Sequence, residues 1–574
     1  MLSYRKLAMC VLGRPFYTGG GIDSPRPASQ RAAAFILTAA MLTTLAAPAF
    51  AKEWYIEDGN ITISAGTEAG TNKVEQAGKD TVDNDKDTII TNQNKDTASS
   101  NTVTIDAGSD KVEVTLQDVN IKADSGSALT SKGDVTLALN GDNHLTGGIS
   151  GTGNYGRNGI ASTGSLTISG GENDSLTAQG GSGADGSYGG HGIYSNGSLT
   201  ISGGTVNATG GDGSNVNGSG ISSNGSVTIS GGTVTANGGN VSGDGIRSDG
   251  GVTISGGTVK AAGGDGSDGG SGISSSSGVT VSDGTVTANG GNGGNVSGDG
   301  IRSDGGVTIS GGTVKAAGGD SKDGYGGDGI RSGGGVTISG NTVNAAGGNG
   351  GKVGGYGICS FDRVAISGGT VEAAGGSSGS SNGGSGIYSN DIDLSGSLEL
   401  TAKAGSPNGK ALSQNGRELD LDAIKDKLGP GAKVTATDAN GETKQVSIPR
   451  PVEPEGPVIP EESSSSSDGG SAAPSAPAFS LPGLTVTDKS GAVIDSISTQ
   501  SGHTLTVCVG RLTASFRISL AALRQLRAEG IETITFQTIL CSTTLSLDEL
   551  LAMGGEDAEA VLTHRFTDSS LTVG

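Results

Sequence analysis

The chain has 574 residues, of which 108 are Gly and 14 are Pro, and its formal net charge is −22. Collagen needs Gly at every third position together with abundant Pro, so this composition excludes it. The strong negative charge argues against a nucleic-acid partner, which favours a basic surface. Because only 3% of the residues are aromatic, a repeat architecture or a disordered chain explains the length better than a compact enzyme does.

An apolar stretch near the start predicts export. Residues 32–47 read AAAFILTAAMLTTLAA after Arg31, and Ala49 and Ala51 place small residues before Lys52. This pattern is typical of a secretory signal peptide, so we expect residues 1–51 to be removed. The alternative is a transmembrane anchor, which needs roughly 20 apolar residues. We therefore expect a secreted protein, extracellular or associated with the cell surface, with no transmembrane segment in the mature chain.

The middle of the chain repeats the phrase VTISGGTV, or a close relative, nine times at intervals of 25 to 33 residues, and a Gly-Ile marker precedes each copy. Each repeat holds three short segments in which apolar and polar residues alternate, which is the period of a strand. Gly pairs separate the segments and permit sharp turns. In the copy at 244–261 we expect one set of residues to point inward, namely Ile246, Val252, Ile254, Val259 and Ala261. The outward set there is Arg247, Thr253 and Lys260.

Three strands and three turns per repeat make one coil of a parallel β-helix. We therefore predict an all-β solenoid over residues 52–448, with coils of about 28 residues. Equivalent positions then stack from coil to coil, as an outer ladder of Thr253, Thr280 and Thr308 and an inner ladder of Ile246, Ile273 and Ile301. The alternative is a disordered Gly/Ser-rich linker, but a linker has no reason to keep Val and Ile in register.

The composition changes beyond the repeats. Residues 419–428 favour a short helix that closes the core, 449–479 form a linker rich in Pro, Glu and Ser, and 480–574 are expected to be a small α+β domain. We predict helices over 519–530, with Ser519 as N-cap and Gly530 as the stop, and over 546–554. An oxidising compartment permits a disulfide between Cys508 and Cys541, and two separate buried thiols are an equal alternative.

Acidic, Gly-rich turns are candidates for calcium, because carboxylates and turn carbonyls are the hard oxygen ligands that this ion prefers. The candidate ligands are Asp244, Asp299 and Asp328 before the Gly-Ile marker, and Asp265, Asp268 and Asp320 in the long turns. The alternative is that Asp in a turn binds local backbone and keeps the surface soluble.

The outward position after the Gly-Ile marker is a second candidate site. It carries Tyr194, Arg247, Arg302, Arg331 and Tyr388, and Tyr356 lies in an adjoining turn. Aromatic rings stack on sugar rings, and Arg pairs with carboxylates such as those of uronic acids. We therefore expect these residues to line a face for an extended polysaccharide. Individually, each of them also fits an ordinary surface position.

A resemblance to a known family follows from the succession VTLQDVNIKADSGSAL, VTLALNGDNHLTGG and the G-I-x-S…VTISGGTVxAxGG repeats, over about residues 52–445. The succession resembles the secreted bacterial carbohydrate-binding domain family. The resemblance implies a right-handed parallel β-helix similar to that of pectate lyases, binding to cellulose and polygalacturonate, and bound calcium. It supplies no binding motif, so the candidate residues above come from the chemistry of the side chains.

Three functions compete. The first is a non-catalytic binding protein for a pectin- or cellulose-like polysaccharide, and the second is a structural surface adhesin or stalk with protein or cell-wall partners. The third is a polysaccharide lyase that uses Asp299, Asp328, Arg302 and Arg331, but their repetition in register favours a surface ladder over one unique site. Since the four His lack zinc spacing with Cys and no nucleophile elbow or phosphate loop is present, we predict no enzyme and no catalytic residues.

Overall fold

The computed structural model forms two compact units, Met1–Pro454 and Glu455–Gly574. In the first it describes residues 52–150, 155–183, 188–214, 217–380 and 382–449. In the second it describes residues 484–487, 493–494, 496–501, 503–509, 514–538, 542–553, 559–564 and 569–573. The predicted signal peptide, 1–51, and almost all of the predicted linker, 449–479, lie outside the described residues, so both stay predictions.

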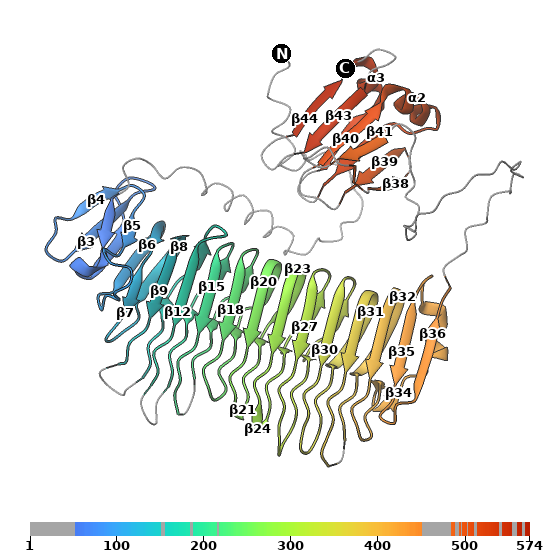
Figure 1. Ribbon diagram of the computed structural model, residues 1–574, viewed down its shortest axis with the longest axis horizontal. Coiled ribbons are helices and arrows are strands. Elements are labelled where there is room, and N and C mark those ends of the chain that lie inside the picture. The colour runs from blue at the N-terminus through green and yellow to red at the C-terminus, as the bar shows by residue number, and fades with distance from the viewer. Residues whose placement is uncertain are drawn as a thin grey trace, which may run out of the picture. The chain divides into compact units, whose positions relative to one another are not determined.

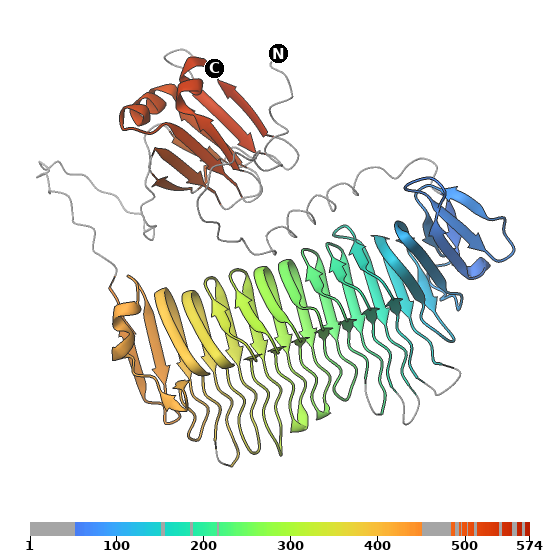
Figure 2. The same ribbon diagram turned by 180° about the vertical axis from the view of Figure 1, so that it is seen from behind.

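The first unit is the predicted parallel β-helix, with about 14 turns and coils of about 28 residues. Among the described residues, 34 strands belong to one wound sheet, and equivalent strands of successive coils lie side by side (Figures 1 and 2). Each regular coil contributes one strand to each of three rows, in the order that the sequence predicts.

The first row begins at the Gly-Ile marker and contains β10 (Ile160–Ser162), β13 (Ile193–Ser195), β16 (Ile221–Ser223), β19 (Ile246–Ser248), β22 (Ile273–Ser275), β25 (Ile301–Ser303), β28 (Ile330–Ser332) and β33 (Leu412–Gln414). The second row contains β11 (Leu166–Ser169), β14 (Leu199–Ile201), β17 (Val227–Ile229), β26 (Gly306–Ile309) and β29 (Val336–Ile338). The third row contains β7 (Asn120–Lys122), β9 (Asp142–Thr146), β12 (Ser175–Gln179), β15 (Thr205–Thr209), β18 (Thr233–Asn237), β27 (Thr313–Ala317), β30 (Thr342–Ala346) and β35 (Lys433–Thr437).

Some strands run through more than one row. Those that join two rows are β6 (Val103–Gln117), β8 (Leu129–Asn140), β20 (Val252–Ala262) and β23 (Gly278–Asn289). Those that run through all three rows are β31 (Ile358–Ala374) and β32 (Ile387–Lys403), near the C-terminal end of the unit.

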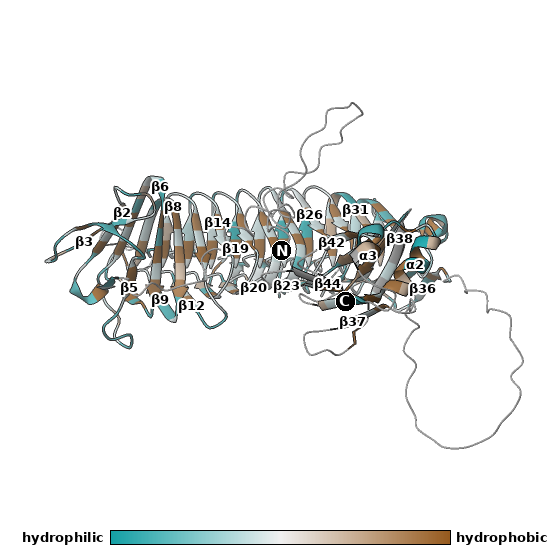
Figure 3. Cartoon of the chain, turned by 90° about the horizontal axis from the view of Figure 1, so that it is seen from above, coloured by the Kyte–Doolittle hydropathy of each residue, from teal (hydrophilic) through white to brown (hydrophobic). Residues whose placement is uncertain are grey.

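The predicted register is confirmed. Ile246 pairs with Ile273 and Ile273 pairs with Ile301, while Thr253, Thr280 and Thr308 form the outer ladder. Every inward residue predicted for the coil at 244–261 is at most 1% exposed. Figure 3 shows the resulting pattern as hydrophobic bands that recur along the β-helix. The aliphatic residues therefore form the continuous core that a single coil cannot bury alone.

Long turns return each coil to the next first-row strand and form the fringe along one edge of Figure 1, which includes β21 (Gly266–Asp268) and β24 (Gly293–Val296). The two arms of a turn touch through Gly backbone, since the Gly298 N–H donates to the Gly291 carbonyl at 2.9 Å, and successive turns touch in the same way, since the Gly319 N–H of the next coil donates to the Gly298 carbonyl at 2.9 Å. A Cβ at position 298 would overlap the carbonyl group of Gly270 in the preceding coil. Close approach of backbone to backbone therefore explains why these positions are Gly.

Both ends of the β-helix are closed. At the N-terminal end lie β1 (Glu53–Tyr55), the 3-10 turn η2 (Ile56–Asp58), β2 (Ile61–Ala65), β3 (Asn72–Gln76), β4 (Val82–Asp85) and β5 (Ile89–Thr91). The Trp54 indole N–H there donates to the Asp85 carboxylate at 2.8 Å in the buried core. At the C-terminal end lie β34 (Arg417–Glu418), η3 (Asp422–Lys427) and β36 (Thr443–Ser447). The predicted helix at 419–428 is thus a 3-10 turn, and it buries Ile424.

The second unit is the predicted small α+β domain. One sheet contains β37 (Leu484–Thr487), β40 (Ala514–Ser519), β43 (Glu559–His564) and β44 (Ser569–Val573), and the other contains β38 (Ile497–Ser501), β39 (Thr504–Cys508), β41 (Thr533–Gln537) and β42 (Ser542–Ser546). The helices are α2 (Leu520–Ala528) and α3 (Leu547–Met553).

In the second unit, the predicted start and end of the first helix are confirmed. Ser519 is the N-cap of α2, because its hydroxyl accepts the Ala522 N–H at 3.2 Å, and Gly530 ends the helix with φ +90°. Phe516 and Phe536 pack in the core with ring centroids 5.3 Å apart. Cys508 is a half-buried free thiol. Cys541 lies outside the described residues.

Candidate functional site

The first feature is a column of outward side chains that follow the marker Ile of each coil, here called the Arg/Tyr column. Its members, in coil order, are Ala161, Tyr194, Ser222, Arg247, Ser274, Arg302, Arg331, Cys359, Tyr388 and Ser413. Paired strands lie about 4.8 Å apart, so this is also the spacing of the column. The structure thus places five of the six predicted sugar-binding residues at one register position, and Tyr356 lies beside them.

Aromatic contacts gather at two places on this column. Tyr356, in the turn before β31, stacks on Tyr388 with ring centroids 4.9 Å apart and an interplanar angle of 19°. Earlier in the chain, His191 stacks on Tyr194 with centroids 5.6 Å apart. These contacts hold the rings against the coils and restrict their rotation. Preformed aromatic surfaces of this kind lose little conformational entropy when a ligand stacks on them.

Cys359 is a member of the Arg/Tyr column that sequence reasoning missed. Its neighbours in the column are Arg331 and Tyr388, yet its side chain is only 1% exposed. Burial, together with the charge of Asp328, raises the pKa of the Cys359 thiol. A buried, protonated thiol is chemically inert, so Cys359 acts here as a packing residue. In the sequence, a Cys at a position where other coils carry a polar, charged or aromatic residue was the signal that could have identified this member of the column.

A second column lies two residues before each marker Ile and contains Asp244, Asp299 and Asp328, here called the acid column. Each carboxylate accepts a backbone N–H from the next coil: Asp244 Oδ1 from Ser271 at 2.8 Å, Asp299 Oδ1 from Asp328 at 2.8 Å, and Asp328 Oδ1 from Tyr356 at 2.7 Å. These side chains therefore connect successive coils, which goes beyond the local hydrogen bonding that the sequence suggested as an alternative to calcium.

Burial governs the ionisation of the acid column. It raises the pKa of Asp244 to about 6 and that of Asp328 to about 7, and it also raises the pKa of Asp299. The charge of Asp299 raises the pKa of Asp328 further, whereas the Tyr356 N–H and the Arg331 guanidinium oppose the shift. Arg331 Nη1 lies 3.5 Å from Asp328 Oδ2, and Arg247 Nη1 lies 3.8 Å from Asp244 Oδ2. The Arg residues thus partly neutralise the carboxylates beneath them.

The remaining predicted metal ligands lie on the long turns. Asp265 Oδ1 accepts the Asn292 N–H, and Asp320 Oδ1 accepts the Asn349 N–H, each at 2.6 Å. Asp268 is exposed on β21.

The arrangement of these carboxylates does not match the coordination that calcium requires. Within the described ranges no group of three or more His, Cys, Asp or Glu side chains is arranged so that it could hold a metal ion. Five of the six predicted ligands already use one oxygen for a backbone N–H, and the second oxygens of Asp244 and Asp328 face guanidinium groups. A calcium site needs six to eight oxygens. The described residues therefore do not fit this ion, and calcium stays a prediction without structural support.

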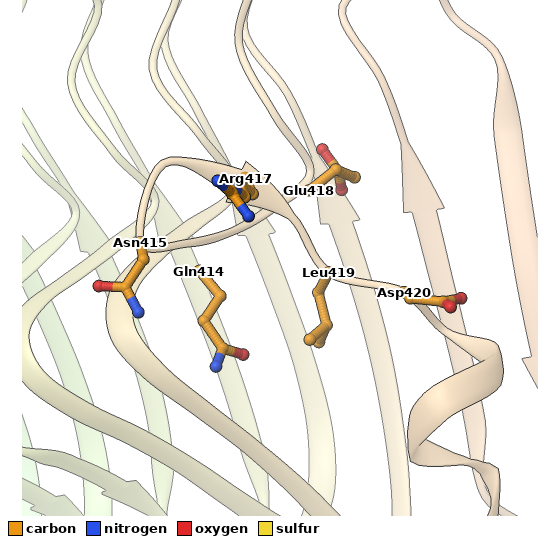
Figure 4. Close-up of a pocket in the computed structure, with 6 residues that line it drawn as sticks. All are labelled: Gln414, Asn415, Arg417, Glu418, Leu419 and Asp420. Atoms are coloured by element: carbon orange, nitrogen blue, oxygen red, sulfur yellow. The ribbon is translucent and has the colours of Figure 1, made fainter.

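A shallow pocket of about 440 Å³ lies at the C-terminal end of the β-helix, in the hairpin formed by β33 and β34. Its lining residues, shown in Figure 4, are Gln414, Asn415, Arg417, Glu418, Leu419 and Asp420. Glu418 Oε1 accepts the Leu412 N–H at 2.9 Å, and partial burial raises the pKa of Glu418. Sequence reasoning did not identify this pocket, because it forms only where the last coil turns back on itself.

In comparisons with known proteins, no family model, no curated protein and no solved structure matches the chain. The parallel β-helix is therefore established by the structure, whereas the resemblance to carbohydrate-binding proteins rests on the residues quoted above. In the part of the chain that the structure describes, no helix has the length and apolar character needed to cross a membrane.

Proposed function

We propose that this chain is a non-catalytic, extracellular polysaccharide-binding protein, and that the Arg/Tyr column is its binding face. The observation that carries the proposal is the alignment of Tyr194, Arg247, Arg302, Arg331 and Tyr388 at one register position. A linear polymer presents the same groups at regular intervals, and the exposed members of the column offer contacts that are whole numbers of coils apart in return. Multiple weak contacts along one chain then add up to useful affinity.

The chemistry of the column supports a glycan ligand. Arg302 and Arg331 occupy neighbouring coils, so their backbones lie about one strand spacing apart, near 4.8 Å. Planar guanidinium groups donate paired hydrogen bonds to carboxylates and hydroxyls. The stacked rings of Tyr356 and Tyr388 in the following coils add a surface for sugar rings. Because the carboxylates beside the column are buried and bound to backbone N–H groups, the surface favours binding over acid–base chemistry.

The experiment is titration of the purified chain with soluble polygalacturonate, together with a pull-down on cellulose. The Arg302→Gln/Arg331→Gln double variant should weaken binding about tenfold or more, because two charge-assisted contacts are lost. The matched control is Lys260→Gln/Lys315→Gln, which removes the same charge from exposed positions in the third row. That control should bind as the parent does. Melting curves of both variants establish that the β-helix is intact.

Two outcomes would overturn the proposal. Absence of binding to both polymers removes the glycan ligand, and attachment to protein partners on cell surfaces would then favour the structural adhesin. Equal losses in the Arg and Lys variants would mean that binding follows net charge and not the column.

A further inference from the structure

The corner between the first and second rows changes character along the β-helix. In regular coils it contains Gly, as in DGG at 249–251 and 304–306 and GGG at 333–335, but the last coils carry FDR at 361–363 and ND at 390–391. In the regular coils backbone touches backbone: the Gly334 N–H donates to the Gly305 carbonyl at 3.0 Å, and a Cβ at position 305 would overlap the Ser277 carbonyl.

In the last coils the place of Gly305 and Gly334 carries a side chain, Asp362, and the corner N–H groups donate to a Ser hydroxyl of the same coil, as Gly251 and Gly278 also do. The Asp362 N–H donates to Ser360 Oγ at 3.2 Å, and the Asp391 N–H donates to Ser389 Oγ at 3.3 Å. A break in an otherwise regular repeat is where a functional site is expected, since the scaffold alone does not require it.

The side chains at the altered corner form a short row, here called the corner row, that consists of Phe361, Asn390 and Asn415. Phe361 is 51% exposed, and the Arg331 guanidinium carbon lies 5.4 Å from its ring centroid. Asn390 Nδ2 donates to the Phe361 carbonyl, and Asn415 Nδ2 donates to the Asn390 carbonyl at 2.7 Å. The corner row therefore leads, one coil at a time, from the Arg/Tyr column at Arg331 to Asn415.

The corner row ends at the pocket of Figure 4, which Asn415 lines together with Arg417 and Glu418. Strand β34 pairs antiparallel with β33, whereas the first-row strands before it pair in parallel. The first row thus stops at this hairpin. A linear polymer that follows the Arg/Tyr column towards the C-terminal end of the β-helix meets the pocket where the ladder ends.

We propose that the corner row and the pocket bind the terminal sugar residue of a polysaccharide chain, so that the protein recognises chain ends. This inference rests on the proposed function. The Phe361 ring offers the stacking surface, and the amides, Arg417 and Glu418 offer the donors and acceptors that the hydroxyl groups of a terminal sugar require. The volume, about 440 Å³, is within the range of sites for small ligands.

The test compares long and short ligands on the full chain. Intact polygalacturonate and its short oligomers, and cellulose and cellohexaose, are offered at equal mass concentration. Shortening the chains about tenfold raises the number of ends about tenfold, so end recognition predicts about ten times more binding sites per mass of ligand. Phe361→Ala should weaken the binding of the short oligomers about fivefold to tenfold.

The matched control is Tyr325→Ala. Tyr325 is an equally prominent aromatic residue, 49% exposed, with Lys352 Nζ 5.8 Å from its ring centroid, but it lies in a long turn away from the first row. This variant should bind the oligomers as the parent does.

The outcomes separate the two proposals. Equal binding per mass of polymer and oligomer, or equal losses in the Phe361 and Tyr325 variants, overturns recognition of chain ends and leaves the Arg/Tyr column as the site. Absence of binding to every polymer and oligomer overturns the proposed function itself.

Discussion

The regular coils and the last coils of the β-helix share one core but differ at their corners. In the regular coils Gly305 and Gly334 bring backbones into direct contact, and nothing larger fits at position 305. In the last coils Asp362 takes the equivalent place and Phe361 takes that of Asp304 and Gly333, and the Asp362 N–H donates to the Ser360 hydroxyl. Both solutions satisfy the backbone polar groups, as a folded chain requires. The difference teaches that the fold accepts a side chain at a corner where the neighbouring coil leaves room for a Cβ, and requires Gly where the neighbouring backbone occupies that space.

The largest effect that this comparison predicts is on stability. Gly305→Ala should lower the free energy of unfolding by about 1–3 kcal/mol or more, because the new methyl group overlaps the Ser277 carbonyl and the coils have to separate. Asp362→Ala, at the equivalent corner of the last coils, should change it by less than about 0.5 kcal/mol. Chemical denaturation of both variants measures the difference. Equal effects would show that the two kinds of corner are packed alike.

The next largest effect is expected at the acid column of the regular coils, where the free energy of unfolding should depend on pH. The pKa of Asp328 is about 7 in the folded chain, against roughly 3.9 when unfolded. Between these values the unfolded chain releases the proton and the folded chain keeps it, so stability falls as pH rises. Asp328→Asn should therefore be more stable than the parent by about 1–3 kcal/mol at pH 8, with no gain at pH 3.5.

The protein itself supplies the precedent for this substitution. Asn158, in the same column, accepts the His191 N–H at 2.8 Å through its amide oxygen, so Asn keeps the link between coils. The groups that face Asp328 are Asp299, Arg331, Tyr356 and Cys359, and all of them stay in the variant. If the stability that the variant gains over the parent is no larger at pH 8 than at pH 3.5, then Asp328 ionises in the folded chain without lowering the free energy of unfolding.

Asp393 in the last coils should show the opposite pH dependence, because its contribution to stability should increase as the pH rises. Partial burial acts to raise the pKa of Asp393, but hydrogen bonds from Lys427, at 3.2 Å, and from Arg363 outweigh it and lower the pKa. Its contribution is present above the unfolded pKa, roughly 3.9, and is lost as the pH falls through the folded value. Asp393→Asn should cost about 0.5–1 kcal/mol at pH 7 and almost nothing at pH 2. A cost that is independent of pH would assign the effect to packing.

Calcium should have the smallest effect. Because five of the six candidate carboxylates accept backbone N–H groups and two of these also face Arg side chains, millimolar calcium should shift the melting temperature by less than about 1 °C relative to a chelator. A larger shift, lost again with a chelator, would restore the calcium site that the sequence suggested.

The sequence was sufficient for the fold because its signal is local and repeated. The alternation of Val and Ile with polar residues sets which side of each strand faces the core, and the constant interval sets the register. Ile246, Ile273 and Ile301 stack as expected for that reason. The same logic placed Arg302 and Arg331 side by side in the Arg/Tyr column. In the C-terminal unit, Ser519 and Gly530 determined the limits of a helix through their own capping chemistry.

Only the tertiary structure decided what the side chains do once stacked. Whether Asp328 binds a cation or a backbone N–H depends on the turn of the next coil, which is distant in sequence. The burial of Cys359, the exposure of Phe361 beneath Arg331 and the pocket at Asn415 likewise arise from neighbours in other coils. A periodic sequence determines how the coils align, because each strand carries its own alternation of apolar and polar residues. Contacts between turns depend on the shape of the backbone between the strands, which only the assembled solenoid defines.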